Sequence, residues 1–515
     1  MKSRTLFWWT WALLGMHVLW MVVRFGLGFP IWGDEAFVVN NFADLGYAEL
    51  FEPLPNGQVA PLLWLWLEKL FYDLGDGSIY WLRFPALVAG VVSTWLMLRF
   101  CLRALPQPSA LFAFAIFAAA YYPLRHAVEV KPYALDLLFT LVQLNLALDL
   151  IAASGKRLRR KAIALVLISA VGVWASYPSM FVSGGLALYF FARKSTRVKA
   201  VAGSLVFGVS AVAMVFLFAL PHARAASWLM EMDMWTPAFP PLDRIWTWPL
   251  WLVERHAGYM SAYPTGGRDY GSSVSLALMV VGAVGLWRCR QRAFLGLLLA
   301  PLLFNFVAAT GKFYPYGGSI RVSIFMAPAL CLLMGHGLTL CVQRFKPTVQ
   351  RYAAHTICVL LFAFTSMGLV RDIQQPYKSE GDVRAKEFAA WMAEHVMDDA
   401  IVLGWCYQKD GAPDFHGHGG SMARLRVQLR QAGIRVEWLS TGAQKVIVQN
   451  RVVQNRADGQ AFWLLAYTDD NDTTIPFAEA EFQTTLQAFD LAGFSSEHFN
   501  FPFYKAERID LYRFE

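Results

Sequence analysis

Eleven long apolar runs constrain the fold of this 515-residue chain more than any other feature of its sequence. They lie at residues 6–29, 79–98, 109–124, 133–153, 162–176, 178–192, 200–220, 272–287, 293–310, 320–342 and 352–370. A helix of about 20 apolar residues crosses a bilayer, and lipid offers the backbone no water to bond. With 57% hydrophobic residues, the chain is too apolar for a soluble enzyme. We predict a mainly α-helical, polytopic membrane protein with about eleven transmembrane helices.

Basic residues recur in every second connection between these runs, which predicts the topology. Cytoplasmic loops are enriched in Lys and Arg, and the N-terminus carries Lys2 and Arg4. The basic connections hold Arg99 and Arg103; Lys156, Arg157, Arg159, Arg160 and Lys161; Arg193, Lys194, Arg197 and Lys199; Arg288, Arg290 and Arg292; and Arg344, Lys346 and Arg351. We predict a multi-pass membrane protein with its N-terminus inside and its C-terminus outside. Topology explains this charge better than a nucleic-acid partner does.

The composition changes after the last run. Residues 372–515 contain 14 Lys and Arg against 21 Asp and Glu, whereas residues 1–371 contain 31 against 16. Segments 400–403 and 460–467 resemble buried strands, and 384–396 and 422–432 resemble helices. We predict a transmembrane domain at 1–371 with a long first outer loop at 30–78, and a soluble, extracytoplasmic α/β domain at 372–515. His416 and His418 have a metal-compatible spacing but lack a clear third ligand.

Two adjacent carboxylates, Asp34 and Glu35, follow the first apolar run within the stretch IWGDEAFVVNN at residues 31–41. Charge is costly at a membrane boundary, so the pair needs a reason. One reason is structural: Asp34 caps a short helix that begins near Glu35. The other is functional: Asp34 acts as a base. The pair alone leaves both explanations open.

Other predicted outer loops contain further candidates. The second holds Arg125, His126, Glu129 and Lys131, the third (221–270) is rich in Trp and Pro, and the fourth holds Lys312, Tyr316 and Arg321. Each has a structural explanation: an interfacial ion pair of Glu129 with Lys131, an aromatic belt in the third loop, and a snorkelling Arg321. Together, carboxylates and cations on one face suit a base that activates a hydroxyl while cations hold a phosphate-bearing leaving group.

Four short motifs give the sequence a family resemblance. They are Gly33-Asp34-Glu35-Ala36 with Asn40; Pro61-Leu-Leu-Trp followed by Leu82-Arg83-Phe84-Pro85; Glu129-Val-Lys131-Pro132-Tyr133-Ala-Leu; and Tyr314-Pro-Tyr316-Gly with Arg321 and Pro328. In this order they resemble motifs of the GT-C glycosyltransferases, most closely the bacterial relatives of protein O-mannosyltransferases and aminoarabinose transferases. The resemblance covers about residues 1–370.

The resemblance implies inverting transfer of a sugar from a polyprenyl-phosphate donor to a hydroxyl of a lipid, glycan or protein acceptor. Asp34 would be the general base, and Glu35 would orient it or the acceptor. The residues implied to bind the donor phosphate or substrate are Glu129, Lys131, Arg125, His126, Arg83, Lys312, Tyr316 and Arg321. Lys131 replaces the usual Arg and loses its bidentate geometry. A divalent metal ion, held by Asp34 and Glu129, is left open.

Two other functions are compatible with a polytopic chain. A transporter or flippase of lipid-linked sugars would favour charges deep within the spans and a repeat relating two halves. The chain has few mid-span charges and no visible repeat. Alternatively, the tail is a binding module on an inactive membrane anchor.

Overall fold

The computed structural model describes residues 3–193, 196–227, 235–396, 401–406, 419–439, 462–469, 496–504 and 507–514. His416 and His418 therefore lie outside the described residues. The chain forms two compact units, which are described separately here. The helical unit comprises Met1–Gly28, Gly46–Asp76 and Tyr80–Gln374, and the C-terminal unit comprises Phe29–Leu45, Gly77–Ile79 and Gln375–Glu515.

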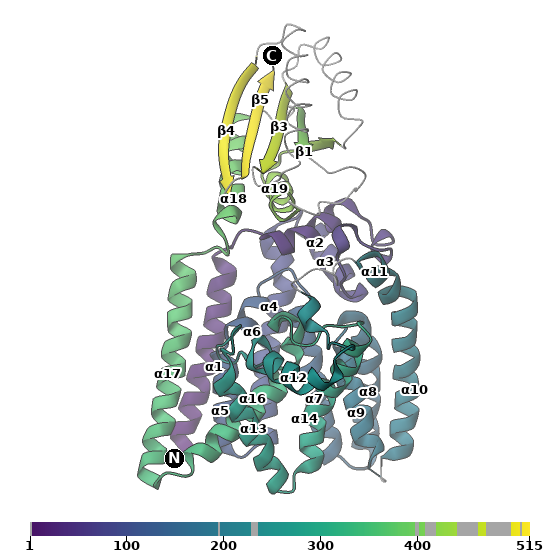
Figure 1. The fold of residues 1–515 in the computed structure, drawn as a ribbon, viewed down its shortest axis with the longest axis vertical. Coiled ribbons are helices and arrows are strands. Elements are labelled where there is room, and N and C mark those ends of the chain that lie inside the picture. Colours follow the sequence, from purple (N-terminus) through teal and green to yellow (C-terminus); the bar gives the residue numbers. More distant parts are fainter. Residues whose placement is uncertain are drawn as a thin grey trace. The chain divides into compact units, whose positions relative to one another are not determined.

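The eleven apolar runs all fold as helices (Figure 1). The helices of the helical unit are α1 (Ser3–Gly26), α3 (Leu62–Leu74), α4 (Ile79–Ala104), α5 (Gln107–Ala118), α6 (Tyr121–His126), α7 (Tyr133–Ala152), α8 (Gly155–Ala175), α9 (Ser179–Phe191), α10 (Arg197–Met214), α11 (Leu220–Ala225), α12 (Trp248–Ala257), α13 (Ser273–Arg288), α14 (Arg292–Thr310), α15 (Ile320–Ser323), α16 (Ala327–Val342) and α17 (Pro347–Gln374). The run at 109–124 is not one helix, because α5 ends at Ala118 and α6 begins at Tyr121.

Six helices in the described part of the chain are long and apolar enough to cross a membrane. They are Ile79–Ala104, Tyr133–Ala152, Val201–Ala225, Arg292–Thr310, Ile320–Val342 and Pro347–Gln374. Shorter apolar helices at Gln107–Ala118, Ser179–Phe191 and Ser273–Arg288 accompany them. The chain is thus a mainly helical membrane protein, and the number of eleven spans stays a prediction.

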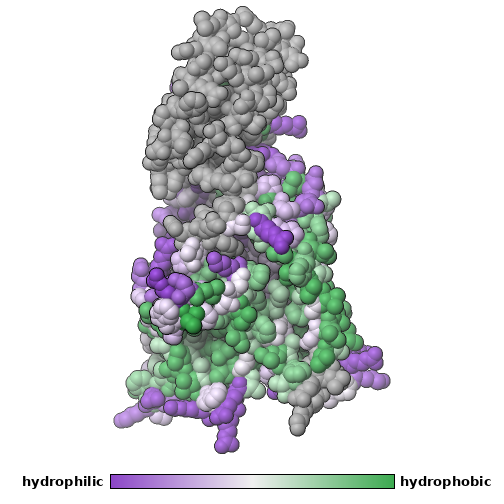
Figure 2. Space-filling model, turned by 45° about the vertical axis from the view of Figure 1, so that its right-hand side comes forward, coloured by the Kyte–Doolittle hydropathy of each residue, from purple (hydrophilic) through white to green (hydrophobic). Residues whose placement is uncertain are grey.

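The outer surface of the helical unit is apolar. Large hydrophobic side chains such as Val209, Phe216, Val274 and Met367 are each more than 60% exposed, and hydrophobic residues dominate the visible face of this unit (Figure 2). Hydrophilic residues gather at its lower edge, the end at which Figure 1 places the N-terminus and the α13–α14 and α16–α17 connections. An exposed apolar surface of this extent indicates contact with lipid.

Two features join the helices of this unit. The α13 and α16 helices pack so closely at Gly282 and Gly337 that a Cβ atom at either position would overlap the backbone of the other helix, as is common for small residues between membrane helices. The α1 and α17 helices are joined by a buried ion pair of Arg24 Nη1 with Asp372 Oδ2 at 2.6 Å. Trp20 donates its indole N–H to the same oxygen at 2.8 Å.

The C-terminal unit contains a mixed five-stranded sheet in the order β2-β1-β3-β5-β4. The strands are β1 (Ile401–Cys406), β2 (Val436–Leu439), β3 (Phe462–Asp469), β4 (Ser496–Tyr504) and β5 (Glu507–Phe514). The β1 strand is parallel to β2 and β3, whereas β5 is antiparallel to β3 and β4. With α18 (Glu380–His395) and α19 (Gly419–Gln431), these elements agree with the predicted strands and helices of an α/β region.

The helix that carries the acidic pair, α2 (Gly33–Asp44), packs against α19 within this unit. Buried Asn40 donates its amide N–H to Ala423 O at 3.0 Å. At the C-terminal end of α2, Asp44 pairs with Arg430 at 2.5 Å and with Arg426 at 3.3 Å. Polar contacts at both positions thus hold α2 against α19.

Candidate functional site

The acidic pair occupies the first turn of α2. Trp32 is the N-cap residue, so Asp34 lies inside the helix and the prediction that Asp34 caps it is wrong. Glu35 has the capping role instead: it is fully buried, and its Oε2 accepts the Trp32 backbone N–H at 3.4 Å. Lys378 lies over the Trp32 ring. Asp34 is partly exposed.

The second-loop candidates form a compact group at α6 and its C-terminal end, which we name the Glu129 cluster: Arg125, His126 and Glu129. Arg125 donates its Nε–H to Glu129 Oε1 at 2.5 Å, and His126 Nδ1 lies 2.8 Å from Glu129 Oε2. Only 4% of the Glu129 side chain and 17% of the Arg125 side chain are exposed. The residues are three and four positions apart, which is the spacing of side chains that meet on a helical turn. Both oxygens of a buried carboxylate therefore orient a guanidinium and an imidazole.

Burial favours the neutral form of the His126 imidazole. Desolvation lowers the pKa of His126, the negative charge of Glu129 opposes that shift, and the charges of Arg125 and Arg321 add to it. A neutral imidazole has one N–H, and donation to the carboxylate requires that proton on Nδ1. The ring of Tyr133 packs edge-on against His126, with centroids 4.9 Å apart. His126 is thus fixed in position by Glu129 and by an aromatic ring.

Lys131 and Arg321 lie in the same region. Lys131 is 6% exposed, donates its Nζ–H to Gln58 Oε1 at 3.3 Å, and bonds through its backbone N–H to Glu129 O at 2.8 Å. Arg321 belongs to α15, which packs against α6. Its guanidinium lies 5.5 Å from the ring centroid of Trp235. The packing of α15 against α6 brings the second and fourth loops close together.

Arg83 lies on the face of α4 that contacts the second loop. Gly90 meets Ala127 so closely that a Cβ atom at Gly90 would overlap the Ala127 side chain. Arg83 is seven residues earlier, two helical turns or about 10 Å along the same face. Its side chain is buried, with 4% exposed.

Tyr316 and Lys312 are not part of this group. Tyr316 is buried, its hydroxyl lies 3.0 Å from His256 Nε2, and its backbone N–H bonds to Ala238 O at 2.9 Å. Lys312 is exposed just after α14, in a left-handed backbone conformation. In the described part of the chain, no hydrogen bond or ion pair links either residue to the Glu129 cluster. Tyr316 therefore joins the third and fourth loops.

Comparison with solved structures identifies other proteins of similar architecture. No protein-family model matches the chain, and no curated protein matches its sequence. The structure of ArnT from Cupriavidus metallidurans in the apo state is 12% identical, with a TM-score of 0.53 over 95% of this chain and 96% of that chain. The same protein bound to undecaprenyl phosphate is 12% identical, with a TM-score of 0.54 over 96% and 97%. The apo oligosaccharyltransferase of Archaeoglobus fulgidus is 11% identical, with a TM-score of 0.51 over 90% of this chain and 70% of that chain.

The chain has the GT-C glycosyltransferase fold. At these identities the likeness concerns the fold alone. It confirms the resemblance seen in the four motifs, and it leaves the roles of individual residues as predictions.

Within the GT-C fold, sequence reasoning missed a second buried carboxylate of the helical unit. Asp136, in the first turn of α7, is 3% exposed. The available signal was an aspartate near the start of an apolar run, where an ionisable residue is unusual.

The resemblance left open a divalent metal ion held by Asp34 and Glu129, and the side chains around Glu129 bear on that hypothesis. In the described part of the chain, no group of three or more His, Cys, Asp or Glu residues is arranged to hold a metal ion. Glu129, one of the two carboxylates implied as ligands, directs both oxygens to Arg125 and His126. Because Glu129 is held by these two side chains, it is not arranged as a metal ligand, and we derive no step through a metal ion.

Proposed function

We propose that this protein is an inverting membrane glycosyltransferase. It transfers a sugar from a polyprenyl-phosphate donor to a hydroxyl of a lipid, glycan or protein acceptor on the outer face of the bacterial inner membrane. The observation that carries the proposal is the buried Glu129 cluster with Lys131 and Arg321 nearby, in a chain of GT-C fold.

Phosphate binding is the first step. Arg125, Lys131 and Arg321 bring positive charge to one region of the helical unit. Breaking the bond between the sugar and the phosphate leaves negative charge on the phosphate, and fixed cations stabilise that charge as it develops. A guanidinium has five N–H donors, so Arg125 can bind Glu129 and also reach a phosphate oxygen. Glu129 thus acts as a positioning residue.

Proton transfer is the second step. We assign Asp34 as the general base that accepts the proton of the acceptor hydroxyl while that oxygen attacks the sugar carbon opposite the phosphate. Glu35 bonds to the Trp32 backbone, so its contribution is to hold the first turn of α2 in shape.

The lipid donor and the membrane orientation complete the proposal. ArnT, which shares the fold, has been solved with undecaprenyl phosphate bound, and the apolar outer surface of the helical unit suits a donor with a long lipid tail. The basic connections lie towards the cytoplasm, so residues 372–515 form the extracytoplasmic domain and residues 1–371 the transmembrane domain.

The test compares two carboxylates of α2. Asp34→Asn removes the proposed base, and Asp44→Asn alters the other end of the same helix, where Asp44 pairs with Arg426 and Arg430. Purified variants are assayed for transfer of labelled sugar from a polyprenyl-phosphate donor to envelope extract. General-base catalysis contributes about 10²–10⁴-fold, so Asp34→Asn should lose at least 100-fold and Asp44→Asn little. Undiminished turnover by a folded Asp34→Asn variant would exclude the role of Asp34. Translocation of the lipid-linked sugar across vesicles without a new glycosidic bond would favour a transporter.

A further inference from the structure

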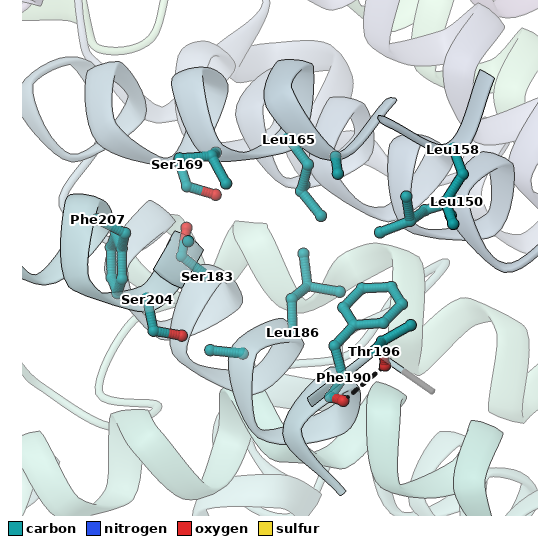
Figure 3. Close-up of a pocket in the computed structure, with 14 residues that line it drawn as sticks. Leu150, Leu158, Leu165, Ser169, Ser183, Leu186, Phe190, Thr196, Ser204 and Phe207 are labelled. Carbon is teal, nitrogen blue, oxygen red and sulfur yellow. Dashed lines mark hydrogen bonds between the residues drawn. The ribbon is translucent and has the colours of Figure 1, made fainter. Parts of the chain in front are cut away.

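An apolar groove lies between four helices of the helical unit, away from the Glu129 cluster in sequence. It is a narrow groove with a volume of about 80 Å³. Figure 3 shows side chains of α7, α8, α9 and α10 around it, with Leu150 and Leu158 at one end and Ser169 and Phe207 at the other. Nothing in the proposed glycosyl transfer uses this groove.

The length of the groove matches one leaflet of a bilayer. Its wall on α8 runs from Leu158 to Ser169, eleven residues or about 16 Å of helix. Half of the ~30 Å hydrocarbon core is about 15 Å. The groove also begins at the first turn of α8 and the last turns of α7 and α9, where the predicted spans meet the basic connections. A chain in this groove would run from the membrane surface towards the bilayer centre.

Two polar side chains of the groove wall, Ser183 and Thr196, have hydrogen-bond partners within the protein. Ser183 donates its hydroxyl to Gln143 Oε1 at 3.2 Å. Thr196 donates its hydroxyl to Phe190 O at 2.8 Å, the bond drawn in Figure 3. Most of the remaining wall is hydrocarbon, including Leu165, Leu186 and Phe207. The occupant that fits such a wall is apolar.

Cations stand at the surface end of the groove. Three nearby cations share one carboxylate: Arg99, Arg103 and Lys161 contact Asp149 at 3.2, 2.7 and 2.7 Å. Arg159, in the first two turns of α8, and Arg193, two residues after α9, have no ion pair with a carboxylate in the described part of the chain. Arg159 is exposed, and the Arg193 guanidinium lies 4.5 Å from the Tyr189 ring centroid.

The first two turns of α8 point to an anion for a separate reason. They carry Lys156, Arg157, Arg159, Arg160 and Lys161 and no acid. Positive charge is unfavourable at a helix N-terminus, because the peptide dipoles already place partial positive charge there. An anionic headgroup at this position would offset both the charge of the basic side chains and the partial positive charge of the helix N-terminus.

We propose that this groove binds an anionic phospholipid of the leaflet at the basic end of the helices. One acyl chain occupies the groove between α8, α9 and α10, and the lipid phosphate binds Arg159 and Arg193. The site is a structural lipid site, distinct from the site proposed for the donor, and it does not depend on the proposed glycosyl transfer.

The experiment measures retained lipid on the full chain. Protein purified in mild detergent is incubated with palmitoyl-oleoyl phosphatidylglycerol or with phosphatidylcholine of the same chains, and native mass spectrometry counts the bound lipids. Ala187→Trp fills the groove wall, and Leu188→Trp is the matched control, because Leu188 is the next residue of α9 and is 49% exposed away from the groove. A second comparison uses two double variants. The double variant Arg159→Gln/Arg193→Gln removes the proposed phosphate-binding cations, and the double variant Arg288→Gln/Arg290→Gln is its control.

We expect one phosphatidylglycerol to be retained by the natural chain and by Leu188→Trp, and to be lost from Ala187→Trp. Each cation near an anionic lipid surface contributes ~1 kcal/mol, or about fivefold in affinity. Removing Arg159 and Arg193 should therefore weaken phosphatidylglycerol about 25-fold and leave phosphatidylcholine unchanged, whereas the control pair changes neither. Equal retention of the two lipids by the natural chain, or unchanged phosphatidylglycerol on a folded Ala187→Trp variant, would overturn the proposal.

Discussion

Replacement of Glu129 by Gln tests whether the buried carboxylate positions the phosphate-binding cations. Gln keeps the volume of Glu and can still accept the Arg125 Nε–H, but its charge is lost and its amide N–H₂ faces His126 Nδ1. The natural carboxylate is 4% exposed and makes two charge-assisted bonds, of 2.5 and 2.8 Å. Hydrogen bonds to charged groups contribute about 1.5–3 kcal/mol. If that energy serves to hold the Arg125 guanidinium in its binding geometry, donor affinity should fall about 10- to 150-fold.

The assay is binding of undecaprenyl phosphate to the purified chain, measured beside the thermal unfolding temperature. Asp149→Asn is the control, because Asp149 is also a carboxylate with three cationic partners but lies outside the Glu129 cluster. We expect Glu129→Gln to lose lipid-phosphate affinity and Asp149→Asn to keep it. A loss of stability in both variants is compatible with the reasoning, since both lose charged partners.

A double-mutant cycle separates positioning from a direct role. If Glu129 acts through Arg125, the effects of Glu129→Gln and Arg125→Gln on affinity should not add, because the two residues share one contact. The reasoning is refuted if Glu129→Gln binds lipid phosphate as well as the natural chain does. Fully additive losses would refute the positioning role and leave Glu129 as an independent contact.

Three further predictions concern other described contacts. Lys131→Arg should retain sugar transfer and Lys131→Met should lose at least tenfold, measured as kcat/KM for the donor, because the site needs a cation there. Burial lowers the pKa of His256 from 6.5 to about 4, so the unfolded state binds more protons below pH 6.5 and stability falls as pH decreases from 6.5 towards 4. The loss is up to ~3 kcal/mol; His256→Gln, which can still bond to Tyr316, should flatten the unfolding temperature over this range. Asn40→Ala should destabilise the C-terminal unit by about 1–3 kcal/mol in chemical denaturation, whereas Asp44→Ala should cost at most ~1 kcal/mol and show salt dependence.

Local patterns in the sequence predicted most of the helical unit. Each apolar run could be predicted as helical because its length and hydrophobicity are properties of contiguous residues and need no knowledge of distant contacts. Two runs are divided: 109–124 breaks after Ala118, and a 3-10 turn at Ile324–Met326 interrupts 320–342. Hydropathy gives no sign of either break. The Glu129 cluster was also predictable, since its members lie within one turn of each other and therefore meet whatever the rest of the chain does.

Long-range contacts explain what the sequence did not show. The prediction assigned residues 30–78 to one outer loop, but α2 packs on α19, nearly 400 positions later, through Asn40 and Ala423. Tyr316 was predicted to bind substrate, yet its hydroxyl bonds to His256 in the third loop. Asp149 lies among the basic residues that indicated topology and binds three of them. Each of these contacts depends on how distant segments pack, which no local pattern specifies.

The position of Arg125 offers a reason for the Lys at position 131. The motif that this chain resembles has Arg there, and a Lys cannot replace the planar, bidentate contact of a guanidinium with phosphate. In this structure the guanidinium comes from Arg125, six residues before Lys131. Its Nε–H donates to Glu129 Oε1 at 2.5 Å. Lys131 follows two residues after Glu129, and its Nζ donates to Gln58 Oε1 at 3.3 Å. We infer that Arg125 supplies the fork and Lys131 a point charge. Arg125→Lys should therefore reduce donor binding more than Lys131→Arg does.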